Sequence, residues 1–182
     1  MPEYLIKVKG TTPLLSHRFI GKDENKRVMR LPEVEQASEY AYRVDPDNDK
    51  SNLAALGYWF RGALVESFLS SAGSKSVRKT KEEVGPRLWV KPDLIDLGTK
   101  TFNINRKIIP IKRAGMIADM ADVIRPEIKD WGCEFTLVSE LARTDKEIEA
   151  EVIRSGKNQG VGSGRAIGYG RFEVVSFKKT SP

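Results

Sequence analysis

Five glycines occur within the eleven residues from Gly160 to Gly170, in the stretch GVGSGRAIGYGRF. A backbone without Cβ atoms can bring its amides close to a phosphate group. Rossmann and P-loop phosphate sites, however, need their glycines between a strand and a following helix. Here a predicted helix precedes the loop and a predicted strand follows it, which argues against that kind of nucleotide site. Arg165 and Arg171 add positive charge and favour contact with a nucleic-acid backbone, although the stretch also fits an ordinary loop.

His17 is the only histidine and follows a predicted first strand, in the stretch TPLLSHR. A histidine can be the general base of a ribonuclease, but a lone histidine is more often structural. The run DPDND at 45–49 resembles the opening of a calcium loop but lacks its glycine and its closing glutamate, so we interpret it as a solvated turn. The single cysteine, Cys133, excludes a cysteine-built zinc site. The sequence therefore predicts no metal and no other cofactor.

Basic residues with aromatic residues nearby in the sequence form the most informative pattern. Basic side chains follow a phosphate backbone, and aromatic or apolar side chains pack against unpaired bases. The residues predicted to bind nucleic acid are His17, Arg18, Arg61, Arg78, Lys79, Arg106, Lys107, Lys112, Arg113, Arg125, Gly162, Gly164, Arg165, Tyr169 and Arg171. The residues predicted to pack against bases are Met116, Ile117 and Met120.

The charge of the chain is unevenly distributed. The net charge is +6 and the isoelectric point is about 9.4, with acidic residues gathered in 31–50 and basic residues in 152–182. Such a separation suits binding of a polyanion on one face, although a solvated surface of mixed charge is equally consistent with it. There is no long apolar run and no signal-like start, and the one cysteine suits a reducing compartment. We therefore expect a cytoplasmic protein that does not contact membranes.

The hydrophobic pattern predicts alternating strands and helices. Strands are expected at 4–10, within 87–98 and at 171–179, and helices at 53–71 and 144–156, the latter beginning at a Thr144–Glu147 capping box. A charged insertion is expected at 18–50 and a long hairpin at 107–139. The hairpin contains two further strand candidates, at 107–113 and 131–139. The order is therefore strand, helix, strands that include the hairpin, helix and strand, which without the inserted parts is βαββαβ. That order predicts an α+β, ferredoxin-like fold, with an antiparallel sheet and both helices on one face.

These motifs resemble those of the RAMP superfamily, the repeat-associated RNA-binding proteins of CRISPR systems. The stretch GVGSGRAIGYGRF resembles the glycine-rich loop of that superfamily, and the segment at 61–64, Arg-Gly-Ala-Leu, resembles its first helix. The resemblance implies one RAMP-like, RRM-like domain over 1–182. It also implies that residues 108–128 occupy the place of the hairpin that acts as a thumb between bases in guide-RNA-coating backbone subunits. The chain differs from those subunits in being shorter and in lacking a second large insertion.

Two stretches also resemble a group of bacteriophage proteins. They are TPLLSHR at 12–18 and the pairing of GSGR at 162–165 with GRF at 170–172. This resemblance implies a protein that coats single-stranded DNA during replication or recombination.

We therefore predict a protein that binds single-stranded nucleic acid, with DNA favoured, and that self-associates along the strand without catalytic activity. One alternative is a CRISPR-type RNA-binding backbone subunit, or an RNA-processing endonuclease with His17 as its base. Another is a phage regulatory or structural protein that binds a protein partner through the acidic segment 23–49.

Overall fold

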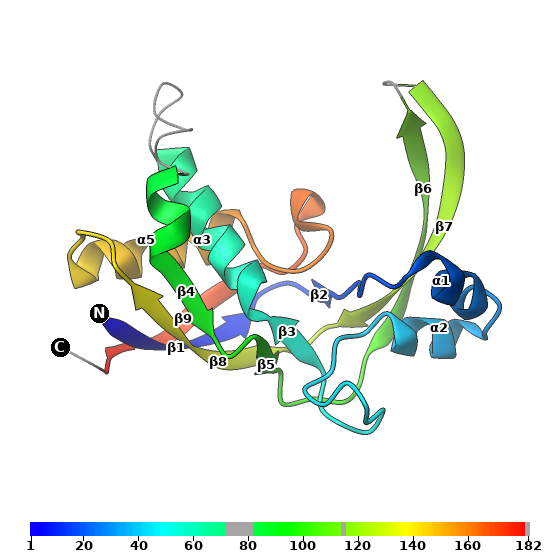
Figure 1. Ribbon diagram of the computed structural model, residues 1–182, viewed down its shortest axis with the longest axis horizontal. Helices are drawn as coiled ribbons and strands as arrows, with labels where there is room; N and C mark the ends of the chain where they lie inside the picture. Colours follow the sequence, from blue (N-terminus) through cyan, green and yellow to red (C-terminus); the bar gives the residue numbers. More distant parts are fainter. Residues whose placement is uncertain (72–81, 114–115, 181–182) are drawn as a thin grey trace.

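The computed structural model describes residues 1–71, 82–113 and 116–180. Within these residues the main sheet has four strands in the spatial order β4-β8-β1-β9. The four strands are β1 (Glu3–Gly10), β4 (Leu88–Lys91), β8 (Gly132–Ser139) and β9 (Phe172–Lys179). All three pairings are antiparallel, and the first strand lies between the third and the fourth. This is the predicted ferredoxin-like topology (Figure 1).

Two helices cover one face of this sheet, as the sequence predicted (Figure 1). They are α3 (Gly57–Ser71) and α5 (Asp145–Asn158). Helix α5 begins at the expected capping box, in which the Glu147 amide donates a hydrogen bond to the Thr144 hydroxyl. It runs two residues beyond Gly156, which was predicted to end it. Gly156 is needed inside the helix, because an added Cβ would lie 2.4 Å from the Phe172 carbonyl oxygen where α5 approaches β9.

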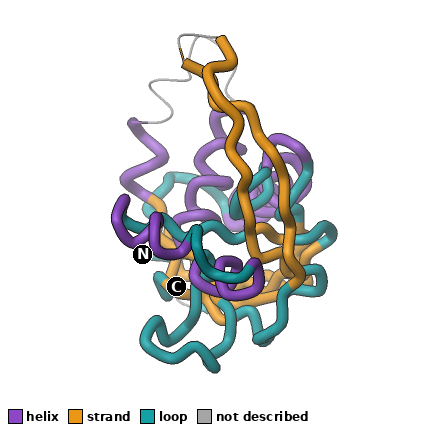
Figure 2. Tube along the Cα trace, turned by 90° about the vertical axis from the view of Figure 1, so that its right-hand side faces the viewer, coloured by secondary structure: helices purple, strands orange, loops and turns teal. Residues whose placement is uncertain are grey.

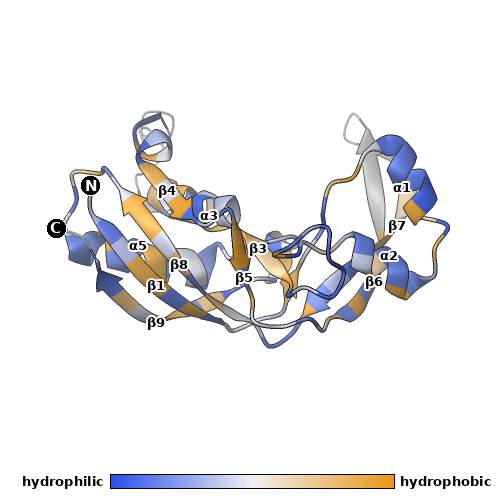
Figure 3. Ribbon diagram, turned by 60° about the horizontal axis from the view of Figure 1, so that its bottom comes forward, coloured by the Kyte–Doolittle hydropathy of each residue, from blue (hydrophilic) through white to orange (hydrophobic). Residues whose placement is uncertain are grey.

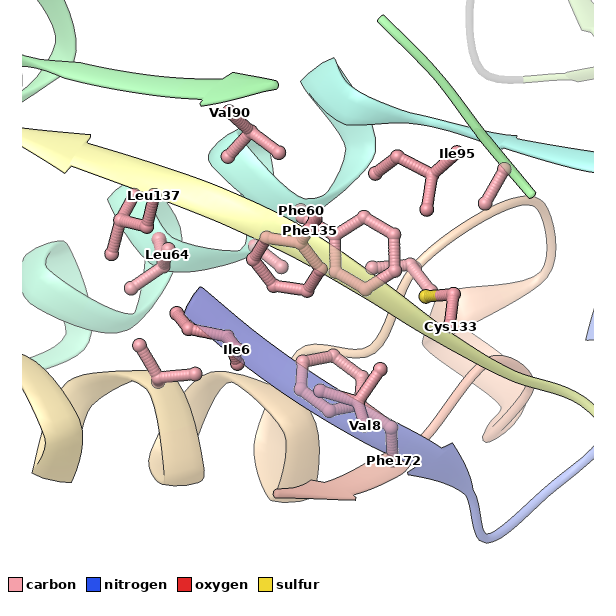
Figure 4. Close-up of a cluster of buried hydrophobic side chains, with 14 of the residues drawn as sticks. Ile6, Val8, Phe60, Leu64, Val90, Ile95, Cys133, Phe135, Leu137 and Phe172 are labelled. Carbon is pink, nitrogen blue, oxygen red and sulfur yellow. The ribbon is translucent and has the colours of Figure 1, made fainter. Parts of the chain in front are cut away.

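The core lies between these helices and the sheet (Figure 4). Side chains alternate along β1, so Ile6 and Val8 are buried while Lys7 between them is exposed on the open face of the sheet. Phe60 of α3 packs against Phe135 of β8 with ring centroids 4.6 Å apart. Burial of these alternating apolar positions is the main driving force for the fold, at roughly 25 cal/mol per Å² of apolar surface.

Helix α3 begins later than predicted. Residues 54–56, expected to be helical, form β3 (Ala54–Leu56), which pairs antiparallel with β5 (Leu94–Asp96). Pairing with β5 overrides the helical periodicity of these apolar residues, which are buried in either conformation. The chain reaches β4 through the 3-10 turn η2 (Gly85–Arg87).

The long hairpin differs in extent from the predicted 107–139. It consists of β6 (Asn103–Arg113) and β7 (Met116–Ile128), which pair antiparallel, and β7 also pairs with the short β2 (Leu14–Leu15). Residues 132–139, predicted as the returning strand, are instead β8 and pair with β1 and β4. The apolar alternation of Cys133, Phe135 and Leu137 belongs to the main core, which explains the difference. Figure 2 shows the two hairpin strands rising from the rest of the molecule.

The charged insertion folds onto this hairpin. It contains α1 (Lys22–Val28) and α2 (Glu33–Glu39), and it has a small core of its own formed by Ile20, Val28 and Tyr40. Figure 3 shows both helices beside β6 and β7, at the end of the molecule far from the two termini. Helix α2 contacts both hairpin strands. The insertion therefore covers one face of the hairpin base.

The last strand contains an irregularity that the sequence pattern did not reveal. The register between β1 and β9 shifts at Lys7/Val8, so strict alternation along β9 is lost. Phe172, Val174 and Phe177 all pack on the core, whereas strict alternation would place Phe177 on the opposite face from the other two. Val175, at the irregularity, is 55% exposed.

No helix within the described residues is long and apolar enough to cross a membrane.

Candidate nucleic-acid interface

The glycine loop is packed against its own chain. The Gly170 amide donates a hydrogen bond to the Pro13 carbonyl and the Ser163 amide donates one to the Leu15 carbonyl, both at 2.8 Å. The Val161 amide closes the loop by donating to the Gly170 carbonyl at 2.9 Å. We expected the loop to lie flat against nucleic acid or against a neighbouring subunit. These three amides are instead committed within the chain, to the TPLL segment and to the loop itself.

The glycines are required for this close packing. Gly162 and Gly170 adopt left-handed backbone angles, with φ of 76° and 70°. An added Cβ on Gly162 would lie 2.6 Å from the Leu15 carbonyl oxygen, and one on Gly170 would lie 1.8 Å from the Val161 carbonyl oxygen. Their role in this structure is to let the loop pack on residues 13–15, which positions the side chains that the loop carries.

Tyr169 connects the loop to the hairpin. Its hydroxyl accepts a hydrogen bond from the Asn105 side-chain amide at 3.1 Å, and the Lys107 ammonium lies 5.2 Å from its ring centroid. The ring also lies against Gly164, where an added Cβ would approach it to 3.0 Å. Tyr169 was predicted to contact nucleic acid, and this stays a prediction; within the chain its ring and hydroxyl contact Lys107 and Asn105.

The two loop arginines also make internal contacts. Arg165 donates two hydrogen bonds to the Glu66 carboxylate of α3, at 2.9 and 3.2 Å. One terminal nitrogen of Arg171 donates to the Arg165 carbonyl at 3.3 Å, and the other is buried without a hydrogen-bond partner. The loop that contains the short turn η3 (Arg165–Ile167) is therefore tied to α3, and the charge of Arg165 is compensated by Glu66.

The hairpin presents its own polar face toward the loop. Asn105 is paired with Arg125 and Lys107 with Val123, and directly paired residues project from the same face of a sheet. We call the face that carries these four residues the inner face, because Asn105 and Lys107 both contact Tyr169 of the glycine loop. The opposite, outer face carries Arg106 and meets α2.

Arg125 and His17 form the most unusual pair at this face. Arg125 is half-buried, its Nε has no hydrogen-bond partner, and burial lowers its pKa. The His17 ring stacks on Tyr40, with centroids 4.9 Å apart and planes inclined by 14°. Desolvation of the ring by these neighbours, and then the positive charge of Arg125, lower the pKa of His17, although by surface area the residue is exposed. A negatively charged ligand at this position would compensate the unfavourable free energy of burying the charge of Arg125.

Three predicted phosphate-binding arginines have partners elsewhere in the chain. Arg106 is ion-paired with Glu33 and Asp122. Arg18 lies within ion-pair distance of Glu24 and Glu39, at 3.6 and 3.5 Å. Arg61 donates a hydrogen bond to the Gly85 carbonyl at 2.6 Å, and its buried Nε has no partner. Each of these three arginines therefore has a partner within the chain, and Arg18, which follows His17, is held by acids of the insertion.

Several predicted residues lie outside the described part of the structure. Arg78 and Lys79 fall in the segment that is not described. Lys112, Arg113, Met116 and Ile117 belong to the β6 and β7 backbone, but their side chains are likewise outside it. Met120 is 55% exposed, and its pairing with Pro110 places it on the outer face. The predictions for these residues remain predictions.

Sequence reasoning missed Asn105 and Glu127. The Asn105 side-chain amide donates to the Glu127 carboxylate at 2.7 Å as well as to Tyr169, so it links both hairpin strands to the loop. No local pattern marks these residues, because their meeting depends on the β6–β7 register.

The described side chains offer little for metal or thiolate chemistry. No group of three or more His, Cys, Asp or Glu residues among them could hold a metal ion. Cys133 is buried, and burial raises its pKa to about 12, so it is a neutral thiol. The interface can bind an anion through Lys107, Arg125 and His17.

Comparison with known proteins supports the fold. No protein-family model matches the sequence. No curated protein matches it either. A chain in the cryo-EM structure of the Type III-B Cmr-beta bound to cognate target RNA is similar, with a TM-score of 0.61 and 13% identity. The similarity covers 99% of this chain and 61% of that chain, so this protein spans less than two thirds of its neighbour's length. The chain thus has an α+β, ferredoxin-like fold that is similar to the fold of this neighbour.

Two further solved structures are more distant. Cmr6 from Pyrococcus furiosus has a TM-score of 0.49 and 9% identity, over 96% of this chain and 98% of its own. Cmr1 from the same organism has a TM-score of 0.42 and 11% identity, over 98% of this chain and 50% of its own. At TM-scores below 0.5 we draw nothing from these two similarities.

Proposed function

We propose that this protein binds single-stranded nucleic acid, preferentially RNA, along the inner face of its hairpin. The observation that carries the proposal is the group formed by Lys107, Arg125 and His17. Among the described residues Lys107 has no carboxylate within ion-pair distance, and the Arg125 Nε has no hydrogen-bond partner. The positive charges of Lys107 and Arg125 are therefore not neutralised by carboxylates within the described part of the chain. A phosphate backbone is a polyanion that satisfies them.

RNA replaces DNA as the preferred ligand in this proposal. The preference for DNA came from the resemblance of two stretches to phage proteins, and no comparison supports that link. The neighbour with the shared fold belongs to a complex bound to target RNA, which supports RNA. In this proposal the hairpin is the thumb, and several copies of the protein bind side by side on one strand.

An RNA-cleaving activity is a second candidate, favoured by one observation. The lowered pKa of His17 leaves its ring neutral near neutral pH, and Arg125 lies close enough to affect it electrostatically. A neutral imidazole beside a cation is an arrangement suited to general-base cleavage of RNA. Incubation of a labelled hairpin RNA without metal, with wild type and His17→Ala, separates the two functions. Cleavage that is lost in the variant would select the nuclease.

The binding proposal is tested by fluorescence anisotropy with labelled single-stranded RNA and DNA of about 30 nucleotides, long enough for more than one site. The double variant Lys107→Ala/Arg125→Gln should weaken RNA binding at least about tenfold. It should also reduce the slope of log K against log salt by about 1.4, at roughly 0.7 for each phosphate contact with a single strand.

The matched control for this experiment is Lys7→Ala, which removes one positive charge from the open face of the sheet. This variant should bind RNA like the wild type. Wild-type protein that binds neither strand at low salt would overturn the proposed function. If the loss of binding free energy per removed charge were the same in Lys7→Ala, which lacks one charge, as in the hairpin variant, which lacks two, only net charge would matter, and the assigned site would be overturned.

A further inference from the structure

Two aromatic side chains stand out on the surface beside the proposed phosphate site. Phe19 is 90% exposed and Tyr58, in the first turn of α3, is 63% exposed. A single exposed apolar side chain is ordinary in a soluble protein. These two residues, however, both lie beside Tyr42, which is partly buried.

The supporting aromatic residues hold this surface in place. Trp59 makes edge-to-face contacts with Tyr42, at 5.5 Å between ring centroids, and with Tyr58, at 6.2 Å. Burial first, and then its interaction with Tyr58, raise the pKa of Tyr42, and the nearby Phe19 backbone opposes this rise. The Tyr42 amide also donates a hydrogen bond to the Ser16 hydroxyl at 3.4 Å, so residues 40–42 lie beside the chain that leads to Phe19. Tyr42 therefore adjoins both exposed residues, which brings residue 19 close to the start of α3.

The chain between the phosphate site and this surface is short and well fixed. The Ser16 amide donates to the Pro126 carbonyl of β7 at 3.1 Å, and the Arg18 amide donates to the Tyr40 carbonyl at 2.8 Å. The Arg18 side chain is held by Glu39, whereas His17 and Phe19 on either side of it are exposed. Two residues of extended chain span at most about 7 Å. Phe19 thus lies within a nucleotide or two of a phosphate bound beside His17 and Arg125.

We propose that Phe19 and Tyr58 form a stacking site for an unpaired base of the bound strand. The inference rests on the proposed function and assigns base contacts to two exposed aromatic residues, whereas the half-buried Tyr169 contacts Lys107 and Asn105 within the chain. An exposed aromatic face beside a group of cations matches the chemistry of single-stranded nucleic acid, in which base and phosphate alternate. Tyr58 adds a hydroxyl that can hydrogen-bond the edge of a base. An apolar protein partner would not account for the neighbouring cations.

The test compares two ligands of equal charge, a single-stranded oligouridine and an abasic strand of the same length and backbone. Wild type should bind the base-bearing strand more tightly. Phe19→Ala and Tyr58→Ala should each weaken binding of the base-bearing strand about 5-fold or more, because removal of one stacking aromatic reduces affinity by roughly 5- to 150-fold. Neither variant should change binding of the abasic strand. Phe19→Trp should keep the affinity, and its added indole fluorescence should be quenched when the base-bearing strand binds.

Val175→Ala, which truncates another exposed apolar side chain on β9, is the matched control and should bind both strands like wild type. If Phe19→Ala and Tyr58→Ala bind the oligouridine like wild type, while the Lys107/Arg125 variant is weakened, the stacking site is wrong and the proposed function stands. The exposed aromatic surface would then serve a protein partner. If wild type binds neither strand, the proposed function itself fails, and this inference fails with it.

Discussion

At the scale of single residues, the environment of each arginine distinguishes its role. Arg106 and Arg165 are paired with acids of the insertion and of α3, and thus hold parts of the molecule together. Arg125 lies half-buried with an unsatisfied Nε, which is costly unless a ligand completes its hydrogen bonds. Arg106 and Arg165 therefore have a structural role, whereas Arg125, which has no carboxylate partner among the described residues and lies beside His17, is available to an anion.

Binding should depend on pH through His17. In the free protein, burial and Arg125 lower the pKa of His17, so its ring is neutral at pH 7. A bound phosphate favours the imidazolium and raises this pKa, so binding takes up a proton and RNA affinity should increase as the pH falls. From about pH 8 to about pH 5.5, which spans the ordinary histidine pKa of about 6.5, we expect a gain of about 3- to 10-fold.

Anisotropy titrations across this range, with His17→Gln as the control, measure the effect. The variant should show a nearly flat profile at the affinity of the neutral form. A rise in affinity of the same size in the variant would assign the proton uptake to another group and remove His17 from the phosphate site.

At the scale of elements, the glycine loop acts as a joint between three segments. It packs on residues 13–15, Tyr169 binds the hairpin, and Arg165 binds α3. We therefore expect substitutions of its glycines to lower the free energy of unfolding of the protein.

Gly170→Ala and Gly168→Ala separate steric packing from backbone conformation. Both residues have positive φ, of 70° and 93°, so either alanine costs about 1–2 kcal/mol of conformational strain. An added Cβ has no neighbour within 4 Å at Gly168, but at Gly170 it overlaps the Val161 carbonyl oxygen. Gly170→Ala should therefore lower the free energy of unfolding by about 3 kcal/mol or more, because overpacking adds a further penalty of about 1–3 kcal/mol.

Urea denaturation followed by circular dichroism measures both variants, with the m-value checked for two-state behaviour. Equal destabilisation by the two alanines would contradict the close packing of Gly170 on Val161.

At the scale of the whole molecule, the hairpin leaves a long strand edge unpaired. Within the described residues β6 pairs only with β7, so the other edge of its eleven residues has no strand partner. An exposed edge of that length readily pairs with another chain. Together with Ile108 and Met120, which are 66% and 55% exposed, it makes the hairpin the best surface for contact between neighbouring copies.

Self-association should therefore be directed by the nucleic acid. On a single-stranded RNA of about 45 nucleotides, sedimentation velocity should show several protomers per strand, and on one of about 10 nucleotides a single protomer, since OB-type single-strand sites cover roughly 4–16 nucleotides. Ile108→Lys should reduce the number of protomers on the long strand and leave binding to the short strand unchanged, because Ile108 lies on the outer face of the hairpin. One protomer on both lengths would contradict coating of the strand.

The sequence by itself determined the positions of the main-sheet strands and of the two covering helices, because alternation, the 3.6-residue period and the Thr144 capping box are local properties of each segment. The extent of the hairpin was not predictable, because the alternating pattern of residues 132–139 predicts a strand but does not specify its partners, which are β1 and β4. The tertiary structure alone decided which cations are available. Arg165 meets Glu66 across 99 residues and Arg106 meets Glu33 across 73, and such pairing depends on the packing of distant elements. The glycine loop, which is the most conspicuous motif of the sequence, thus contributes to the interface by packing on residues 13–15 and by contacting the hairpin through Tyr169. Lys107, Arg125 and His17 became a site only when β6, β7 and the segment after β2 came together.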